Sequence, residues 1–261
     1  MEEHEFDDFE HDHDYDHEQE VLDAEEHIQA NLAEIRQIIS QAALKSGRTA
    51  EDITILAITK HQELEVMAAT YNCGLKNFGE SYLQEALEKM EDFADVDDIR
   101  WDMVGHVQSR KAKDVAAHFH AVHSLDSLKL ARLLNANRPA ELPAMEVFLE
   151  VNLGNEETKS GLPIESEQDL AELTKLAEEV QQMAGLKLVG LMGMPPLFDD
   201  PEKSRPYFQK LKQTQEFLNN QNETLDLKQI SAGTSHDFAV AIEEGATILR
   251  LGEVLLGPRN Y

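Results

Sequence analysis

The stretch Ile53-Thr54-Ile55-Leu56-Ala57-Ile58-Thr59-Lys60 decides the fold class of this chain. β-Branched and apolar residues dominate it with little alternation, which is typical of a strand buried on both faces in a parallel sheet. Because the carboxyl end of such a strand faces the ligand crevice in α/β proteins, Lys60 is a candidate functional amine. On strand position alone, a solvated lysine that only opens the next helix is the simpler interpretation.

A strand followed by a helix recurs along the chain, since apolar runs alternate with amphipathic stretches that have helical periodicity. We expect strands at 53–60, 75–79, 101–106, 121–124, 146–152, 186–190, 229–233 and 248–252, and the clearest helices at 64–71, 82–93, 126–137, 167–183, 201–220 and 237–244. Repeated βα order implies parallel strands with right-handed crossovers, and the length suits a single (β/α)8 TIM barrel of class α/β. An open doubly wound sheet is the alternative, but the Gly-rich turn that it would need after the first strand is absent.

Residues 1–20 have a different composition, with eleven acidic residues and no Lys or Arg. Such a segment cannot bury enough surface to offset its chain entropy, so we expect a disordered, acidic, His-rich tail before one domain at 21–261. An extra helix is expected to begin at Val21 and to end near Gly47. The tail could hold divalent metals loosely through His4, His11, His13 and His17. A solubilising role is the simpler interpretation, because nothing fixes a coordination geometry there.

The charge balance excludes several classes of partner. The 261 residues carry 51 acidic against 23 basic side chains, a net charge of −28, which would repel nucleic acid and anionic membranes. No run approaches the roughly 18 apolar residues of a membrane span, and the acidic amino terminus does not resemble a signal peptide. The single cysteine, Cys73, suits a reducing compartment, so we expect a cytoplasmic protein. No apolar surface stripe demands a partner, and a monomer is expected.

In a closed barrel, residues just past the strand ends converge on one pocket. Ser235 precedes a helix and offers a hydroxyl and free backbone N–H groups, which suit a phosphate, while Gly233 and Gly252 let the backbone come close. An amine opposite such a cradle predicts a phosphorylated aldehyde held as an imine, namely pyridoxal 5′-phosphate (PLP). The candidate pocket residues are Lys60, Ser81, His106, Asn152, Met192, Thr234, Ser235, Arg250 and Gly252.

Arg250 lies on the last predicted strand, near its end, and is expected to point inward. It is placed either to supply positive charge near the amine or to meet the pyridine nitrogen, and a salt bridge to a helix acid is an equally simple role for it.

Several long motifs occur in order after the strand that ends in Lys60. They are FGESYLQEALEKM from Phe78, WDMVGHVQSRK from Trp101, VHSLDSLKLARLLN from Val122, EVNLGNEETKSGL from Glu150, GLMGMPP from Gly190 and SAGTSHDFAVAIEEGATILRLG from Ser231. With them, the chain from about Ile28 to Tyr261 resembles the YggS/PROSC-type pyridoxal phosphate homeostasis proteins, which share the barrel of the alanine racemase amino-terminal domain.

The resemblance implies that Lys60 forms an internal aldimine, the Schiff base of the cofactor, and that Arg250 faces the pyridine nitrogen. It also implies that Ser235 and the Gly252 backbone hold the phosphate, with His106 and Asn152 lining the pocket. An arginine partner keeps the pyridine nitrogen unprotonated and the ring a poor electron sink, so the cofactor is carried without turnover. Apo-PLP enzymes are the candidate recipients in vitamin B6 homeostasis.

The chain departs from the family pattern at Ser81, where the family has Asn, at Thr234, where it has Met, and at Glu253, where it has a small or basic residue. A carboxylate at Glu253 is expected to weaken phosphate binding unless its side chain leaves the pocket. An amino acid racemase-like enzyme is the alternative function. It needs a tyrosine from a second domain, and the chain ends nine residues after Gly252, which leaves Tyr82 and Tyr207 as candidates. A metal-sequestering protein that acts through the tail is a third class.

Overall fold

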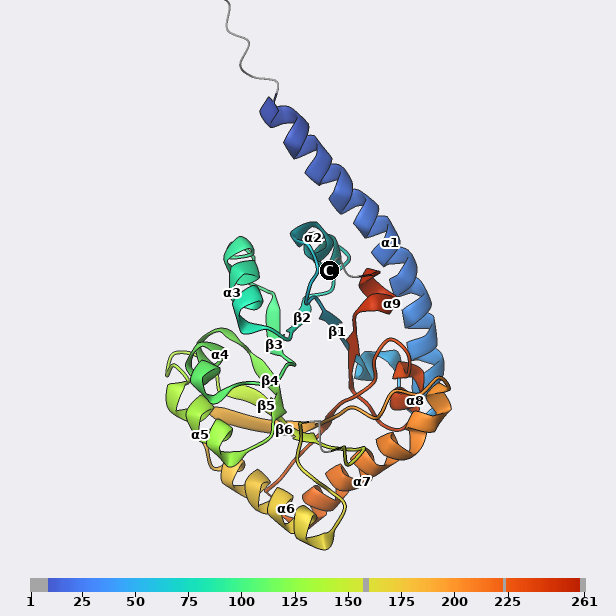
Figure 1. Cartoon of the computed structure of the whole chain (residues 1–261). Helices are drawn as coiled ribbons and strands as arrows, with labels where there is room; N and C mark the ends of the chain where they lie inside the picture. The colour runs from blue at the N-terminus through green and yellow to red at the C-terminus, as the bar shows by residue number, and fades with distance from the viewer. Residues whose placement is uncertain (1–8, 157–159, 223, 259–261) are drawn as a thin grey trace, which may run out of the picture.

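The computed structural model describes residues 9–156, 160–222 and 224–258, and in them eight strands close into a barrel in sequence order (Figure 1). All neighbouring strands are parallel, including the closing pair β1 and β8. The predicted (β/α)8 barrel is therefore confirmed. The strands are β1 (Thr54–Ile58), β2 (Asn77–Glu80), β3 (Arg100–Met103), β4 (Ala121–Leu125), β5 (Met145–Val151), β6 (Leu186–Gly193), β7 (Gln229–Ser231) and β8 (Ile248–Leu251).

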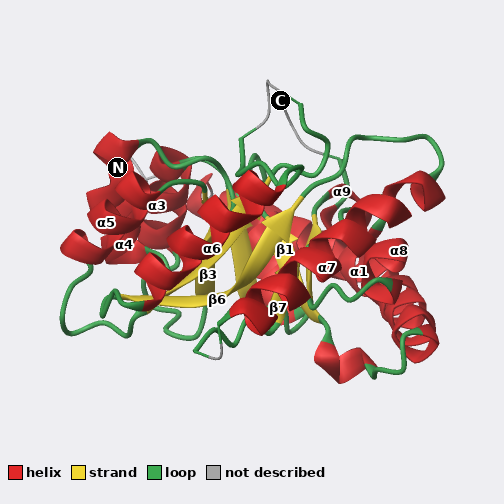
Figure 2. Cartoon of the chain, turned by 90° about the horizontal axis from the view of Figure 1, so that it is seen from below, coloured by secondary structure: helices red, strands yellow, loops and turns green. Residues whose placement is uncertain are grey.

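Helices surround the barrel, as the view turned by 90° from Figure 1 shows (Figure 2). They are α2 (Leu64–Asn72), α3 (Leu83–Asp92), α4 (Ala112–His118), α5 (Leu128–Asn137), α6 (Glu167–Gln181), α7 (Arg205–Gln221), α8 (Phe238–Glu243) and α9 (Glu253–Leu256), with 3-10 turns η1 (Ala50–Asp52), η2 (Ser109–Lys111) and η3 (Pro201–Ser204). The sequence pattern did not single out α4. Its buried residues are few and small, Ala112, Val115 and Ala116, so its apolar periodicity is weak.

The two-residue period of the strands decides which side chains enter the barrel. On β1, Thr54 and Leu56 line a hollow at the amino-terminal end of the barrel, whereas Ile58 and Lys60 line the pocket at the carboxyl end. Leu56 is paired in register with Arg250 of β8. Closure of the barrel places β1 beside β8, so that Lys60, which follows β1, and Arg250, which lies on β8, reach the same pocket.

The amino-terminal helix α1 (Phe9–Lys45) runs along the outside of the barrel beside α2, α8 and α9 (Figure 1). Its buried stripe is Ile28, Leu32, Ile35 and Ile39, and each such side chain contributes roughly 1.5–3 kcal/mol by leaving water. The expected helix start at Val21 is wrong, because α1 begins at Phe9. Extension of an existing helix is cheap, and acidic residues are favourable at its positive amino-terminal end. Residues 9–20, which were expected to belong to the tail, are described as part of α1, residues 1–8 lie outside the described part, and the expected disorder stays a prediction.

Among the helices that the structure describes, we find none with the length and hydropathy of a membrane span.

Candidate functional site

A pocket of about 680 Å³ opens at the carboxyl ends of the strands. It collects residues from all parts of the barrel, from Ile58 after β1 to Glu253 after β8, and only barrel closure places the two ends of this range together. Of the residues singled out in the sequence, those that line it are Lys60, Ser81, His106, Met192, Thr234, Ser235, Arg250 and Gly252. The pocket offers an amine and a guanidinium on its wall and small hydroxyl side chains at its rim.

Asn152 is the one candidate that the structure does not bring to this pocket. Its amide donates to the Glu156 carbonyl at 2.9 Å and accepts from the Glu156 backbone N–H at 3.3 Å. The side chain therefore braces the loop after β5. Sequence position could not reveal this, because the residue leaves the strand just where the loop turns back to pair with Leu162.

Lys60 occupies a tight turn at the end of β1. The Gln62 N–H donates to the Thr59 carbonyl at 3.0 Å, which closes the turn around Lys60 and His61. His61 has φ +58°, in the left-handed region that non-glycine residues seldom adopt. Such backbone conformations persist where the surrounding structure holds them in place, and they cluster at functional sites.

Arg250 is buried, with 8% of its surface exposed. Its Nη1 donates to Oγ of Ser231 at 2.9 Å and its Nη2 to the Gly193 carbonyl at 3.2 Å. Burial lowers the pKa of Arg250 to about 10, with Asp237 and Glu150 opposing the shift, so the guanidinium stays protonated at neutral pH. The salt bridge to a helix acid, considered as an alternative role, is not what orients it: both of these hydrogen bonds are to neutral groups.

A chain of hydrogen bonds continues from Arg250 through the barrel interior. Ser231 Oγ lies 2.8 Å from Nδ1 of His123, and Nε2 of His123 lies 3.1 Å from Oδ2 of Asp102. Arg100 Nε donates to the other Asp102 oxygen at 2.9 Å. His123 is fully buried and stacks on Phe148, with ring centroids 4.2 Å apart.

The protonation states along this chain follow from its partners. Burial lowers the pKa of His123, although Asp102 opposes the shift. Burial alone would raise the pKa of Asp102, but the hydrogen bond from His123 and the charge of Arg100 hold that pKa below its usual value. An ionised carboxylate only accepts, so a neutral His123 donates from Nε2 and accepts at Nδ1 from the Ser231 hydroxyl. The Ser231 oxygen is then free to accept from Arg250.

The part of the pocket next to Arg250 is built by the loops after β7 and β8. Ser235 Oγ accepts from the Val254 N–H at 3.2 Å, which joins the two loops. Gly233 has φ +89°, and a Cβ there would lie 2.8 Å from Cβ of Ala241. Only glycine fits this close approach. Thr234 donates from its hydroxyl to Oδ1 of Asp237 at 3.1 Å, so this hydroxyl serves the turn that precedes α8.

Sequence reasoning missed a carboxyl group in the pocket wall. Glu150 lies on β5 opposite Met192 of β6, and both line the pocket. Ser160 Oγ donates to Oε1 of Glu150 at 2.7 Å, and burial raises the pKa of Glu150. Within the described residues, Oε2 of Glu150 is buried without a hydrogen-bond partner. The two-residue period of a strand could have predicted Glu150, since side chains two residues apart point to the same face and Asn152 had been selected.

The pocket mouth carries aromatic and apolar side chains. Tyr82 and Met194 line it and are 50% and 51% exposed, and the Tyr82 ring lies 5.0 Å from that of His61. His106 pairs with Asp126 at 3.4 Å at the rim. Tyr207, the other candidate phenol, packs against Phe198 with ring centroids 5.6 Å apart and does not line the pocket.

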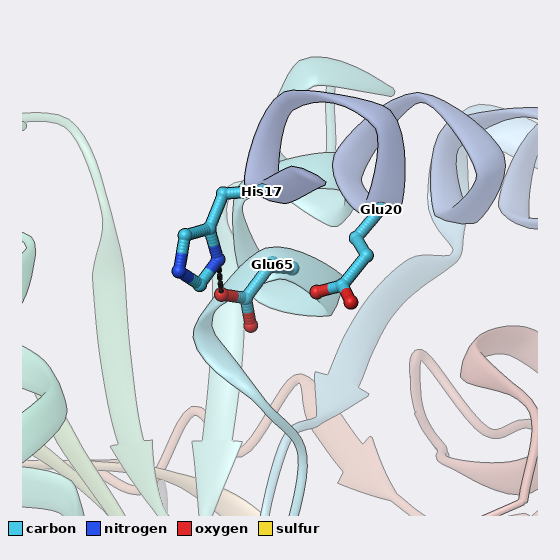
Figure 3. Close-up of side chains that lie close together, drawn as sticks. All are labelled: His17, Glu20 and Glu65. Carbon is cyan, nitrogen blue, oxygen red and sulfur yellow. Dashed lines mark ion pairs between the residues drawn. The ribbon is translucent and has the colours of Figure 1, made fainter. Parts of the chain in front are cut away.

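A second group of potential ligands lies outside this pocket, on α1 and α2. Oxygen and nitrogen atoms of His17, Glu20 and Glu65 fall within 4.8 Å of one another (Figure 3). His17 Nδ1 already pairs with Glu65 at 2.7 Å, and His17 is largely exposed. The predicted metal-holding tail rests mainly on other histidines: His4 lies outside the described residues, and so do the side chains of His11 and His13.

The chain matches the family model described as "Alanine racemase, N-terminal domain" over residues 25–260. A pyridoxal phosphate homeostasis protein of Aquifex aeolicus is 37% identical over 230 residues, which cover 88% of this chain and 97% of that protein. The protein of the same name from Escherichia coli K12 is 36% identical over 233 residues, covering 88% and 96%.

Solved structures with a similar fold include PipY and an alanine racemase. PipY of Synechococcus elongatus with PLP bound has a TM-score of 0.75 at 27% identity, over 88% of this chain and all of PipY. An alanine racemase of Clostridium difficile matches with a TM-score of 0.62 at 16% identity over 88% of this chain and 56% of that chain, which shows a shared fold.

Proposed function

The chain belongs to the alanine racemase N-terminal domain family, and from this membership we propose that it binds PLP covalently at Lys60 and serves PLP homeostasis. The observation that carries the proposal is the convergence of Lys60, Arg250 and Ser235 on one pocket. When bound, PLP supplies an aldehyde that condenses with a primary amine.

The donor set fits a phosphorylated pyridine aldehyde. Arg250 is a buried cation whose Nη1 and Nη2 are already oriented by Ser231 and Gly193. Such a fixed guanidinium would meet the pyridine nitrogen as a donor. Because Arg250 keeps its proton at neutral pH, it gives none to the ring nitrogen, which favours carrying over turnover.

The phosphate would lie against the loops after β7 and β8. Ser235 offers a hydroxyl there, and the backbone N–H groups near Gly252 lie beside it, as the Val254 bond to Ser235 shows. Gly233 removes the Cβ that would hinder the tight turn. Of the remaining candidates, Ser81, His106, Met192 and Thr234 would contact the ring or shape the pocket, and Asn152 would act only through its loop.

Racemase-like catalysis remains the competing proposal, and one observation favours it: the Tyr82 phenol lies in the pocket wall. The Tyr82 ring packs beside His61, however, and half of its surface faces solvent, so it has little to hold it against a substrate. We propose a non-catalytic carrier. We further propose apo-PLP enzymes as recipients, a monomeric state and a cytoplasmic location, in keeping with the single cysteine and the acidic surface.

The absorbance spectrum of the purified protein with added PLP tests the proposal. Wild type is expected to gain a visible band that borohydride bleaches, with the reduced label mapping to Lys60. Lys60→Ala should lose both signals and stay folded. Lys111→Ala is the matched control, since Lys111 also lines the pocket and should keep the label at Lys60. A band that persists in Lys60→Ala contradicts the assignment.

A further inference from the structure

The two residues that flank Lys60 are anchored by side chains of α3 and β2. The Lys89 ammonium donates to the Thr59 carbonyl at 2.7 Å. Thr59 Oγ1 donates to Oε1 of Glu80 at 2.7 Å, and the His61 N–H donates to Oε1 of Glu85 at 2.5 Å. The backbone is thus held on both sides of the lysine, in addition to the turn's own hydrogen bond.

The anchoring groups are also joined to one another. Lys89 Nζ donates to Oε1 of Glu80 at 3.0 Å and to Oε1 of Glu85 at 2.6 Å. All three residues come from one motif, FGESYLQEALEKM, in which Glu80 ends β2 and Glu85 and Lys89 lie one turn apart on α3. The cluster is costly to bury, because Glu80 is fully buried and the Lys89 side chain is 8% exposed.

The pKa values of the two carboxyl groups in this cluster shift in opposite directions. Burial raises the pKa of Glu80 despite Lys89 and Thr59. Burial would also raise the pKa of Glu85, but the hydrogen bonds from Lys89 and from the His61 backbone outweigh it and lower that pKa. A buried ion cluster of this kind seldom adds net stability over apolar packing, so a fixed geometry is the better explanation for it.

The geometry that it fixes is that of the Lys60 turn. His61 adopts φ +58°, and the Glu85 bond to its N–H, together with the Lys89 bond to the Thr59 carbonyl, holds the backbone in that conformation. Lys60 lies between these two anchored peptide units and lines the pocket. We propose that Glu85 and Lys89, with Glu80, are positioning residues that hold the Thr59–His61 turn so that the Lys60 amine faces the pocket. The role of Lys60 rests on the proposed function; the anchoring does not.

Glu85 gives the sharpest test, since its side chain is 24% exposed and alanine is the best helix former, so Glu85→Ala should fold. Glu85→Gln keeps an acceptor oxygen and serves as the conservative rescue. Glu88→Ala is the matched control, because Glu88 is exposed on the same helix and accepts only from Gln84 among the described residues. Thermal unfolding by circular dichroism checks that all three variants remain folded.

The first measurement needs no cofactor: amide hydrogen exchange at His61, followed by NMR. In Glu85→Ala, exchange should accelerate about tenfold or more, because the N–H loses its acceptor and the turn opens locally. Glu85→Gln and Glu88→Ala should stay near the wild-type rate. Exchange at His61 in Glu85→Ala that matches wild type overturns the inference.

The second measurement is the rate at which Lys60 captures PLP, with loss of one water for each amine and aldehyde joined. Misplacement of the amine should slow capture about tenfold or more in Glu85→Ala, with rescue in Glu85→Gln. Unchanged capture alongside faster exchange overturns the positioning role. If wild type captures no PLP, the proposed function fails. The inference is then decided by a third measurement, the rate at which acetic anhydride acylates Lys60, mapped by mass spectrometry. An acylation rate that differs between wild type and Glu85→Ala, with Lys111 unchanged, supports it, and equal rates for Lys60 overturn it.

Discussion

Nδ1 of His123 lies 2.8 Å from Oγ of Ser231, although 108 residues separate them in the sequence. The same Oγ accepts from Arg250, so one hydroxyl joins the buried imidazole on β4 to the guanidinium in the pocket. Behind His123, Asp102 fixes the tautomer that makes this arrangement possible. The orientation of Arg250 therefore depends on groups that do not themselves line the pocket.

Removal of the Ser231 hydroxyl should weaken both the fold and the site. Ser231→Ala leaves a buried Arg250 donor and the Nδ1 acceptor of His123 unpaired, which is expected to cost about 1–3 kcal/mol of the free energy of unfolding. Urea titration measures this loss, and PLP affinity should fall in parallel. Ser40→Ala is the control, because among the described residues the exposed Ser40 hydroxyl bonds only to Arg36, within its own helix. Equal stability of the two variants would show that the chain of bonds does not orient Arg250.

The contribution of His123 to the stability of the protein should fall as the pH drops below neutrality. His123 is neutral in the fold because burial lowers its pKa, whereas in the unfolded chain it binds a proton below about 6.5. From pH 7 to 5 the unfolded state thus gains protons that the folded state cannot, which lowers the free energy of unfolding by up to about 1.4 kcal/mol per pH unit. Asp102 has a lowered pKa and adds its loss only in more acidic solution.

Denaturant titrations at pH 5 and 7 measure this effect. His123→Gln should show a smaller difference between the two pH values than wild type, whereas His118→Gln, at an exposed position, should keep it. Burial also lowers the pKa of His120, so a part of the wild-type dependence is expected to remain in His123→Gln. An unchanged difference in that variant would exclude His123 as its source.

Lys89→Met should be strongly destabilising. It leaves Glu80 fully buried without its cation, and the loss of one partner of a buried pair typically costs about 3–5 kcal/mol. Lys76→Met is the matched control, since the exposed pair of Lys76 and Asp98 should contribute little to the free energy of unfolding. Adding Glu80→Leu to Lys89→Met should recover part of the loss. Similar losses for the two lysine variants would contradict the buried-cluster interpretation.

Glu253 should reduce PLP affinity through its charge. Its side chain is exposed and lines the pocket next to Gly252, where the phosphate is expected. At surface dielectric such a repulsion is worth about 1 kcal/mol or less, so Glu253→Thr should tighten binding by up to about fivefold. The gain should shrink at 1 M salt, where the screening length falls to about 3 Å. Identical affinities at low salt would show that the carboxylate points away from the ligand.

The sequence by itself determined the barrel and the region of the pocket. Alternating buried runs and amphipathic stretches carry the βα order, because both periods are local properties of the backbone. The places of Lys60 and Arg250 at strand ends then sufficed to assign both residues to one pocket. The same reasoning failed for Asn152, where a loop, not a strand, sets the side-chain direction.

Only the tertiary structure decided what holds those two residues. Parallel strands meet through long crossovers, so the contacts of Thr59 with Glu80 and Lys89, or of His123 with Ser231, join segments whose separation leaves no local signal. Local periodicity fixes which elements form, whereas lateral packing fixes which polar groups face each other, and the latter decides how the Lys60 amine and the Arg250 guanidinium are presented to a ligand.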